Sequence, residues 1–147
     1  MRFALPLAVF LLAGAGLAAC AQTSPEETAT DLGPPVNAFR AAEGKRPLRR
    51  NAKADTAAAA HARDMARHGF FGHKGSNGSS VGGRLKAEGC RFTAAAENIA
   101  KGQRSDAEVV AAWAASPGHR RNMLAPHDQY GAARIGDTWV MVLASGC

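Results

Sequence analysis

A stripe of mainly apolar residues, rich in alanine, recurs at helical spacing between Asn51 and His68. Successive members of this stripe lie 4, 3 and 4 positions apart, and they are Ala54, Ala58, His61 and Met65. That spacing keeps them on one face of a helix, whereas Arg63 falls on another face. Asn51 is a favourable N-cap and Gly69 a favourable helix end. The pattern predicts a helix that starts after Asn51, runs to His68 and packs its alanine face closely against another element.

Shorter apolar patterns predict three more helices. One is expected over 36–43 and another over 80–88, each followed by a glycine. The last one opens at Ser105, which with Glu108 has the spacing of a capping box. The Pro117-Gly118 pair is expected to end that helix, so that His119 follows a helix stop.

Strands are expected in the second half of the chain. They cover 93–100, 130–135 and 139–144, and the last two form a terminal hairpin. The segment KRPLRR at 45–50 and the glycine-rich stretch at 70–80 are expected to be connections. Because helices precede a hairpin and strands do not alternate with helices, the pattern predicts an α+β fold.

The first twenty residues have the pattern of an export signal. Arg2 precedes an apolar run over 3–19 that ends in the tetrapeptide Leu17-Ala18-Ala19-Cys20. This tetrapeptide resembles a bacterial lipobox, which implies cleavage after residue 19 and a lipid on Cys20. Two alternatives stay open, namely an ordinary signal peptide cut after Ala21 and an uncleaved anchor. All three place the rest of the chain outside the cytoplasm.

The polar residues that follow divide the chain into three parts. We expect a lipoprotein signal peptide over 1–19, the lipid-anchor Cys20 and a flexible tether over 20–33, and one domain over 34–147. The protein is then held on a membrane of the bacterial cell envelope and faces the periplasm or the exterior. If the ordinary signal operates, it is secreted.

Cysteine usage fits an oxidising compartment. Of the three cysteines, Cys90 and Cys147 remain as a pair once Cys20 carries a lipid. A bridge between them closes a loop of 57 residue steps, which in the loop-entropy model stabilises the fold by about 4 kcal/mol. Two free buried thiols are the alternative.

Charge narrows the class of partner. The chain of 147 residues carries 18 Lys and Arg against 12 Asp and Glu, a net charge of +6. The basic residues are scattered, and only six Phe, two Trp and one Tyr are available to stack on bases. We therefore expect no nucleic-acid partner. Nothing in the sequence indicates the oligomeric state.

Three polar residues occupy positions that general surface polarity does not explain. His73 lies in the glycine-rich loop, Glu97 interrupts the apolar run AAAENIA, and His119 follows the Pro-Gly pair. An unpaired buried carboxylate is costly, so Glu97 needs a partner. Together the three can hold a divalent metal or form an acid–base pair. Spacing alone leaves open that they are separate loop and capping residues, since no H-E-x-x-H motif is present.

Several blocks in order carry a family resemblance. They are VNAFR, KRPL, HARDMARHGFFGHKGSNGSS, RLKAEG, AAENIAKG, VVAAW, SPGHRRNML and YGAAR. In this order the chain resembles the CAP superfamily of cysteine-rich secretory, antigen 5 and pathogenesis-related 1 proteins, in its bacterial secreted branch. The resemblance implies an α-β-α sandwich with a central antiparallel sheet, and a cleft that brings His73, Glu97 and His119 together.

The chain departs from that family at one cleft position. Many eukaryotic relatives carry a second Glu at the end of the Trp-containing helix, where this chain has Ala114-Ala115-Ser116. The resemblance implies His73, His119 and Glu97 as the ligands if a metal such as zinc is bound, although no cofactor is required. His61, Asn98 and Ser116 are expected to support the cleft, His61 from the core or the cleft base. Ser116 is not expected to be a hydrolase nucleophile, because Pro117 lacks the N–H an oxyanion hole needs.

Two functions follow from these expectations. The first is a lipid-anchored binding or interaction module, with a lipid or envelope component as its ligand. The second is a metal-assisted, peptidase-like hydrolase in which Glu97 is the general base and His73 and His119 are ligands. Loss of the second acidic residue favours the binding module over an enzyme.

Overall fold

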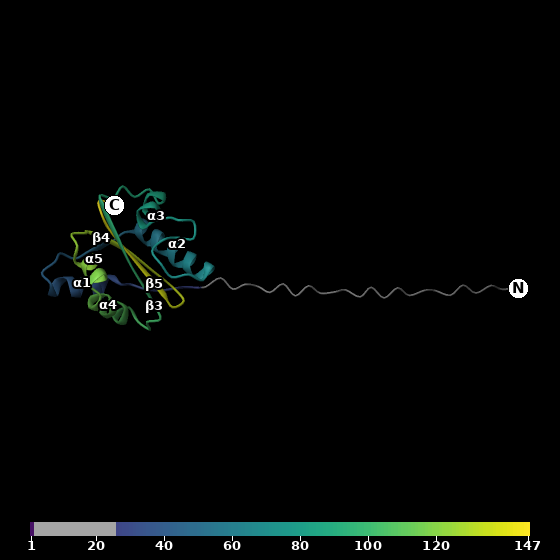
Figure 1. Cartoon of the computed structure of the whole chain (residues 1–147), viewed down its shortest axis with the longest axis horizontal. Coiled ribbons are helices and arrows are strands. Elements are labelled where there is room, and N and C mark those ends of the chain that lie inside the picture. The colour runs from purple at the N-terminus through teal and green to yellow at the C-terminus, as the bar shows by residue number, and fades with distance from the viewer. Residues whose placement is uncertain (2–25) are drawn as a thin grey trace.

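The computed structural model describes Met1 and residues 26–147, and the expected signal peptide and Cys20 lie outside these described residues. Within them, five helices alternate irregularly with strands along the chain (Figure 1). The helices are α1 (Gly33–Ala42), α2 (Ala52–His68), α3 (Val81–Ala87), α4 (Asp106–Ala115) and α5 (Pro117–Leu124). The strands are β1 (Glu27–Thr28), β2 (Arg49–Arg50), β3 (Ala94–Lys101), β4 (Gln129–Ile135) and β5 (Thr138–Ser145).

The strands form one sheet in the order β1-β4-β5-β3. All pairs along this path are antiparallel, and the β4–β5 hairpin has Ile135 opposite Thr138. Strand β2 adds a short parallel pairing to β4, so KRPLRR is more than a connection. Because β3 pairs with β5 alone among the described strands, it is an edge strand of the sheet.

Helices cover both faces of the sheet, which confirms the predicted α-β-α sandwich and α+β class (Figure 1). Side chains of β5 alternate between two cores, as the period of a strand requires. Val140 and Val142 pack toward α2 and α3, whereas Met141 and Leu143 pack toward α1, α4 and α5. The sheet is therefore buried on both faces along β5.

The alanine face of α2 lies unusually close to β4. The predicted stripe is buried as expected, with Ala54, Ala58 and His61 all at 0% exposure. A Cβ built on Gly131 of β4 would overlap the backbone of Ala54. Only glycine fits at position 131, and small residues on α2 complete the close approach. The helix has the predicted bounds because Asn51 Oδ1 accepts hydrogen bonds from the backbone N–H groups of residues 53 and 54.

Residues 27–33 are not part of a tether, contrary to the sequence-based expectation for 20–33. Glu27 and Thr28 pair with the end of β4, and Leu32 is fully buried. Asp106 accepts hydrogen bonds from Thr30 Oγ1 at 2.7 Å and from the Asp31 N–H at 3.0 Å. Polar composition predicted mobility here, but these residues find specific partners on distant elements, so the fold begins before the expected boundary at residue 34.

Helix α4 ends at Ala115, directly before Pro117-Gly118 as expected, but a further helix that the sequence pattern did not predict, α5, begins at Pro117. Ser116 is extended, and Pro117 then occupies the first turn of α5. Proline is favoured at that position because its missing N–H would have no helical acceptor there. His119 therefore lies within a helix.

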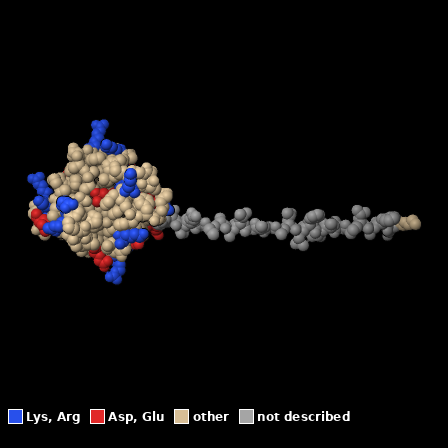
Figure 2. Space-filling view, in the orientation of Figure 1, with Lys and Arg blue, Asp and Glu red and all other residues tan. Residues whose placement is uncertain are grey.

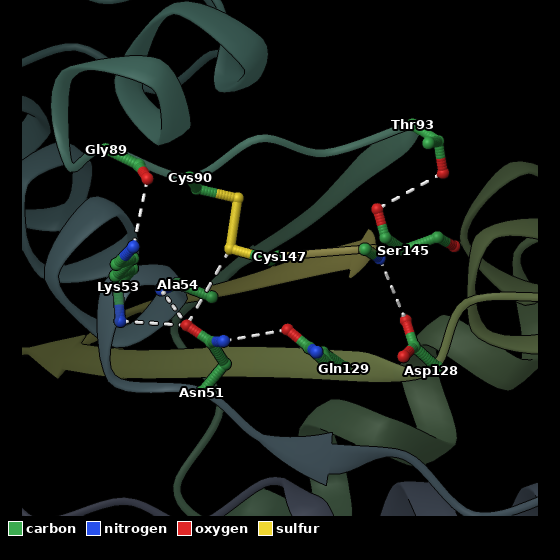
Figure 3. The surroundings of a disulfide bond; sticks show 11 residues. Asn51, Lys53, Ala54, Gly89, Cys90, Thr93, Asp128, Gln129, Ser145 and Cys147 are labelled. Carbon is green, nitrogen blue, oxygen red and sulfur yellow. Dashed lines mark hydrogen bonds between the residues drawn. A yellow bond between two sulfur atoms is a disulfide. The ribbon is translucent and has the colours of Figure 1, made fainter.

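The expected disulfide between Cys90 and Cys147 is present (Figure 3). It joins the chain end to the segment between α3 and β3, across 57 positions of sequence. Neighbouring polar contacts hold the same corner, including Lys53 Nζ donating to the Gly89 carbonyl at 2.9 Å (Figure 3). The bridge therefore ties the end of β5 to the layer formed by α2 and α3.

On the face drawn in Figure 2, Lys and Arg side chains stand apart from one another rather than in one patch. None of the helices within the described residues has both the length and the apolar character that a membrane span requires.

Candidate functional site

Glu97 is the centre of a buried polar cluster at the edge of the sheet. Its side chain is 2% exposed, and it lies on β3 on the face that packs toward α2 and α3. Arg84 of α3 donates from Nη2 to Glu97 Oε2 at 2.6 Å. His73 Nδ1 lies 2.9 Å from Glu97 Oε1. The two carboxylate oxygens thus each have a close partner, and we call Glu97, Arg84, His73 and His61 the Glu97 cluster.

His73 is the exposed member of the cluster. Its side chain is 59% exposed and belongs to the glycine-rich loop between α2 and α3. A carboxylate only accepts hydrogen bonds, so the neutral imidazole donates from Nδ1 to Glu97 and leaves Nε2 as an acceptor. Arg84 fixes the loop as well, because its Nη2 also donates to the His73 carbonyl at 3.3 Å.

His61 forms the base of the cluster. It is fully buried on α2, donates from Nε2 to the Gly72 carbonyl at 2.8 Å and lies 3.6 Å from Glu97 Oε1. Burial lowers the pKa of His61, although the negative charge of Glu97 opposes this shift. Within the described part of the chain its Nδ1 has no hydrogen-bond partner.

His119 reaches the same edge from the opposite layer. Neighbouring side chains on β3 point to opposite faces, so Asn98 faces α5 while Glu97 faces α2. Asn98 is fully buried and donates to the His119 carbonyl at 3.1 Å, a contact that holds the backbone of α5 against the sheet. Burial, and then the charge of His73, lowers the pKa of His119.

Asn122 of α5 completes this link between layers. Its Nδ2 donates to Asn98 Oδ1 at 2.9 Å and to the Glu97 carbonyl at 3.3 Å. Among the described residues, the side chain of Ser116 makes no capping hydrogen bond at the start of α5, and its supporting role stays a prediction.

The expected three-ligand metal set does not fit this arrangement. Within residues 26–147, no three His, Cys, Asp or Glu side chains are grouped as a metal site requires. Glu97 turns its oxygens to Arg84 and His73, and no ion pair joins it to His119 among the described residues. The carboxylate of Glu97 therefore orients the imidazole of His73 instead of binding a common metal ion with it.

Arg84 is the residue that sequence reasoning missed. It is 8% exposed although it carries a full charge. One signal was present, since Arg84 lies three positions after Val81 and next to Leu85, on the buried side of a short helix. A buried carboxylate such as that of Glu97 can be paired with an Arg or Lys as well as with a histidine.

A pocket of about 610 Å³ adjoins the cluster on the α2 side. His61 and Arg84 belong to its wall, so the pocket shares two residues with the Glu97 cluster. The rest of the wall is mostly polar: Ala60, Arg63, Asp64, Arg67, His68, Asn77 and Ser79. This arrangement presents hydrogen-bonding groups beside a rigid, internally paired centre.

Comparison with known families decides the identity of the fold. The model of the cysteine-rich secretory protein family, CAP, matches residues 35–138. The chain belongs to the CAP family. The expected membership and sandwich are thereby confirmed, and the Glu97 cluster lies within the matched part of this CAP domain.

Among CAP relatives, the chain is 37% identical over 107 residues to protein YkwD of Bacillus subtilis strain 168, covering 71% of this chain and 42% of that protein. A solved structure of an extracellular SCP-domain protein from Bacillus anthracis is 25% identical, with a TM-score of 0.72, over 78% of this chain and 39% of that one. An outer surface protein from Borrelia burgdorferi is 19% identical, with a TM-score of 0.77, over 84% of this chain and 99% of that one. The chain thus spans less than half the length of the two Bacillus proteins.

Proposed function

We propose that this CAP domain is an extracytoplasmic, lipid-anchored binding module whose ligand is a lipid or another component of the bacterial cell envelope. The Glu97 cluster, with the adjoining pocket, is the proposed binding surface. Its exposed His73 and the polar wall around His61 and Arg84 supply hydrogen bonds to the ligand.

The pairing of Glu97 with Arg84 carries the proposal. A general base must be able to accept a proton from a substrate or a water within hydrogen-bond reach. Glu97 is 2% exposed and already holds a guanidinium at 2.6 Å and an imidazole at 2.9 Å. A carboxylate used in this way fixes the position of its neighbours, which is what a preformed binding surface needs.

The location of the protein rests on two kinds of support. The tetrapeptide Leu17-Ala18-Ala19-Cys20 predicts a lipid on Cys20. The Bacillus anthracis relative is described as extracellular and the Borrelia protein as an outer surface protein. We therefore propose that the domain stands on the outer side of a membrane, held by Cys20.

The test is mass spectrometry of the full chain purified from its own membrane fraction. We expect loss of residues 1–19, a diacylglyceryl mass on Cys20 and a co-purifying envelope ligand. A Cys20→Ser variant is expected to appear in the soluble exported fraction. A membrane-bound protein with an unmodified Cys20 would contradict the anchor, and so would a Cys20→Ser variant that has lost residues 1–19 and still stays on the membrane.

A metal-assisted hydrolase is the second candidate, favoured by the orientation of His73. A carboxylate that holds Nδ1 and leaves Nε2 outward is the usual support for a metal-ligating or proton-accepting imidazole. If a metal is held, Nε2 of His73 and a nitrogen of His119 are the donors that remain for it. Such an ion would supply Lewis acidity.

Zinc content and peptide hydrolysis separate the two candidates. For the binding module, His73→Ala and His119→Ala are expected to leave the zinc content of the purified protein unchanged. The hydrolase would be favoured over the binding module if the protein contains stoichiometric zinc and both variants, although folded, lose the zinc and the hydrolytic activity.

A further inference from the structure

A second pocket lies at the far ends of α1 and α5, away from the Glu97 cluster. Its volume is about 880 Å³, in the range of sites for small organic molecules. Its wall consists of residue 40 with residues 44–47 and 49 of the segment 44–49 and the whole of the segment 124–128. We propose that this pocket binds a small organic anion, with a carboxylate or phosphate group on a short apolar body.

Arg40 provides a buried positive charge at the pocket wall. It is 2% exposed, and Nε and Nη1 donate to the backbone carbonyls of Arg46, Met123 and Ala125. Nη2 donates to the His127 carbonyl at 3.4 Å. A guanidinium has five N–H groups, so within the described residues one on Nη2 is left without an acceptor. Burial lowers the pKa of Arg40, the expected effect of a charge removed from water.

Within the described chain, no carboxylate balances this charge. Arg40, Lys45 and Arg46 have no acidic partner within ion-pair distance among those residues. The acidic residue of the wall is Asp128, which pairs with Arg49 at 3.3 Å. Four basic residues of the wall therefore face one acidic residue, an imbalance that attracts an anion.

The rest of the wall sets the second requirement for the ligand. Pro47 and Pro126 face the pocket together with Leu124 and Ala125. Their apolar surface gains nothing from a bare inorganic ion, but it favours an attached hydrocarbon group by about 25 cal/mol per Å² buried. An organic anion satisfies the charged and the apolar parts of the wall together.

The Arg40 contacts also make the pocket preformed. One side chain bonds both segments that form the wall, the one at 44–49 through Arg46 and the one at 124–128 through Ala125 and His127. The two segments therefore need little ordering when a ligand enters, which lowers the cost of binding.

Phenyl phosphate is a suitable probe because it combines both features. Titrated into the ¹⁵N-labelled full chain, it is expected to shift the backbone amide signals of segments 44–49 and 124–128. Inorganic phosphate lacks the apolar body and benzyl alcohol lacks the charge, so each is expected to bind at least tenfold more weakly. Equal affinity for either would overturn the proposal, as would the absence of binding by phenyl phosphate.

Charge removal at the rim gives the matched comparison. The double variant Lys45→Gln/Arg46→Gln keeps the Arg46 carbonyl that Arg40 uses, and we expect it to weaken phenyl phosphate binding at least tenfold. Arg91→Gln/Lys101→Gln removes two exposed charges that do not line the pocket and is expected to leave affinity unchanged. Equal losses of phenyl phosphate affinity in both variants would show that the net charge of the protein, and not this pocket, determines binding, and would overturn the proposed site.

A membrane surface is the competing source of anionic groups. Phenyl phosphate is expected to displace the Cys20→Ser variant, which cannot carry the lipid, from phosphatidylglycerol vesicles if a phosphate in this pocket mediates any such binding. Vesicle binding that depends on Lys45 and Arg46 but resists phenyl phosphate would assign these charges to a surface contact and overturn the pocket. The pocket shares no wall residue with the Glu97 cluster, so its failure leaves the proposed function unaffected.

Discussion

Replacing Glu97 by glutamine is the sharpest test of the site. Glu97→Gln keeps the shape of the side chain and removes its charge. Arg84 Nη2 then keeps a neighbour at 2.6 Å but loses its counter-charge, while its Nε already lacks a partner among the described residues. The guanidinium is 8% exposed, so water cannot replace the lost charge.

The magnitude follows from burial. Removing one partner of a buried ion pair costs about 3–5 kcal/mol, because the remaining charge is uncompensated. An exposed pair of the same length is worth about 0–1 kcal/mol. The chain contains such a pair, since Arg63 Nη2 lies 2.6 Å from Glu27 Oε2 with side chains 42% and 50% exposed. Glu27→Gln is therefore the matched control.

The assay is urea denaturation of the full chain and its variants, with Arg84→Met added to close a double-mutant cycle. We expect Glu97→Gln to lower the free energy of unfolding by about 3–5 kcal/mol and Glu27→Gln by less than about 1 kcal/mol. The double variant Glu97→Gln/Arg84→Met is expected to lose about 1–3 kcal/mol less than the sum of the single changes. Additive losses, or equal losses at Glu97 and Glu27, would refute the buried pair.

Three further predictions concern packing, the domain boundary and pH. Gly131→Ala is expected to cost at least about 1–3 kcal/mol of unfolding free energy, because its Cβ meets the α2 backbone, while Gly118→Ala has open space and is the control. Leu32→Ala is expected to lower the free energy of unfolding by about 2–5 kcal/mol, because Leu32 is fully buried in the fold. An unchanged denaturation midpoint would show instead that the residues before 34 are a tether. Burial lowers the pKa values of His61, His119 and His127 in the folded protein, so the unfolded chain binds more protons near pH 6. The free energy of unfolding is therefore expected to fall as the pH drops below about 6.5. Urea denaturation between pH 7 and 5 measures this, and a stability that does not change with pH would count against the lowered pKa values.

Local signals determined the parts of the fold that the sequence predicted well. Helix α2 has the expected bounds because Asn51 and Gly69 act at its ends and a single stripe buries one face. The terminal hairpin extends the expected strands by one residue at most ends. The disulfide followed from cysteine number and compartment. Each of these features depends on residues close in sequence or on counting.

Features that depend on distant partners were missed. Residues 27–33 look polar and mobile, yet Thr30 and Asp31 bond to Asp106, more than seventy positions away. Helix α4 ends before Ser116 and α5 begins at Pro117. A Pro-Gly pair predicts the end of a helix, but it does not show whether a new helix begins at the proline. Arg84 required knowledge of which side chain would face Glu97.

The charge of the Glu97 cluster bears on what it can bind. The charges of Glu97 and Arg84 cancel, and burial lowers the pKa of His61, which favours its neutral imidazole. The end of the Trp-containing helix, at Ala115 and Ser116, adds no negative charge to that of Glu97. A divalent cation is attracted by excess negative charge, which the paired carboxylate here does not provide. The Glu97–Arg84 pair therefore supports the proposed binding module over the metal-assisted hydrolase.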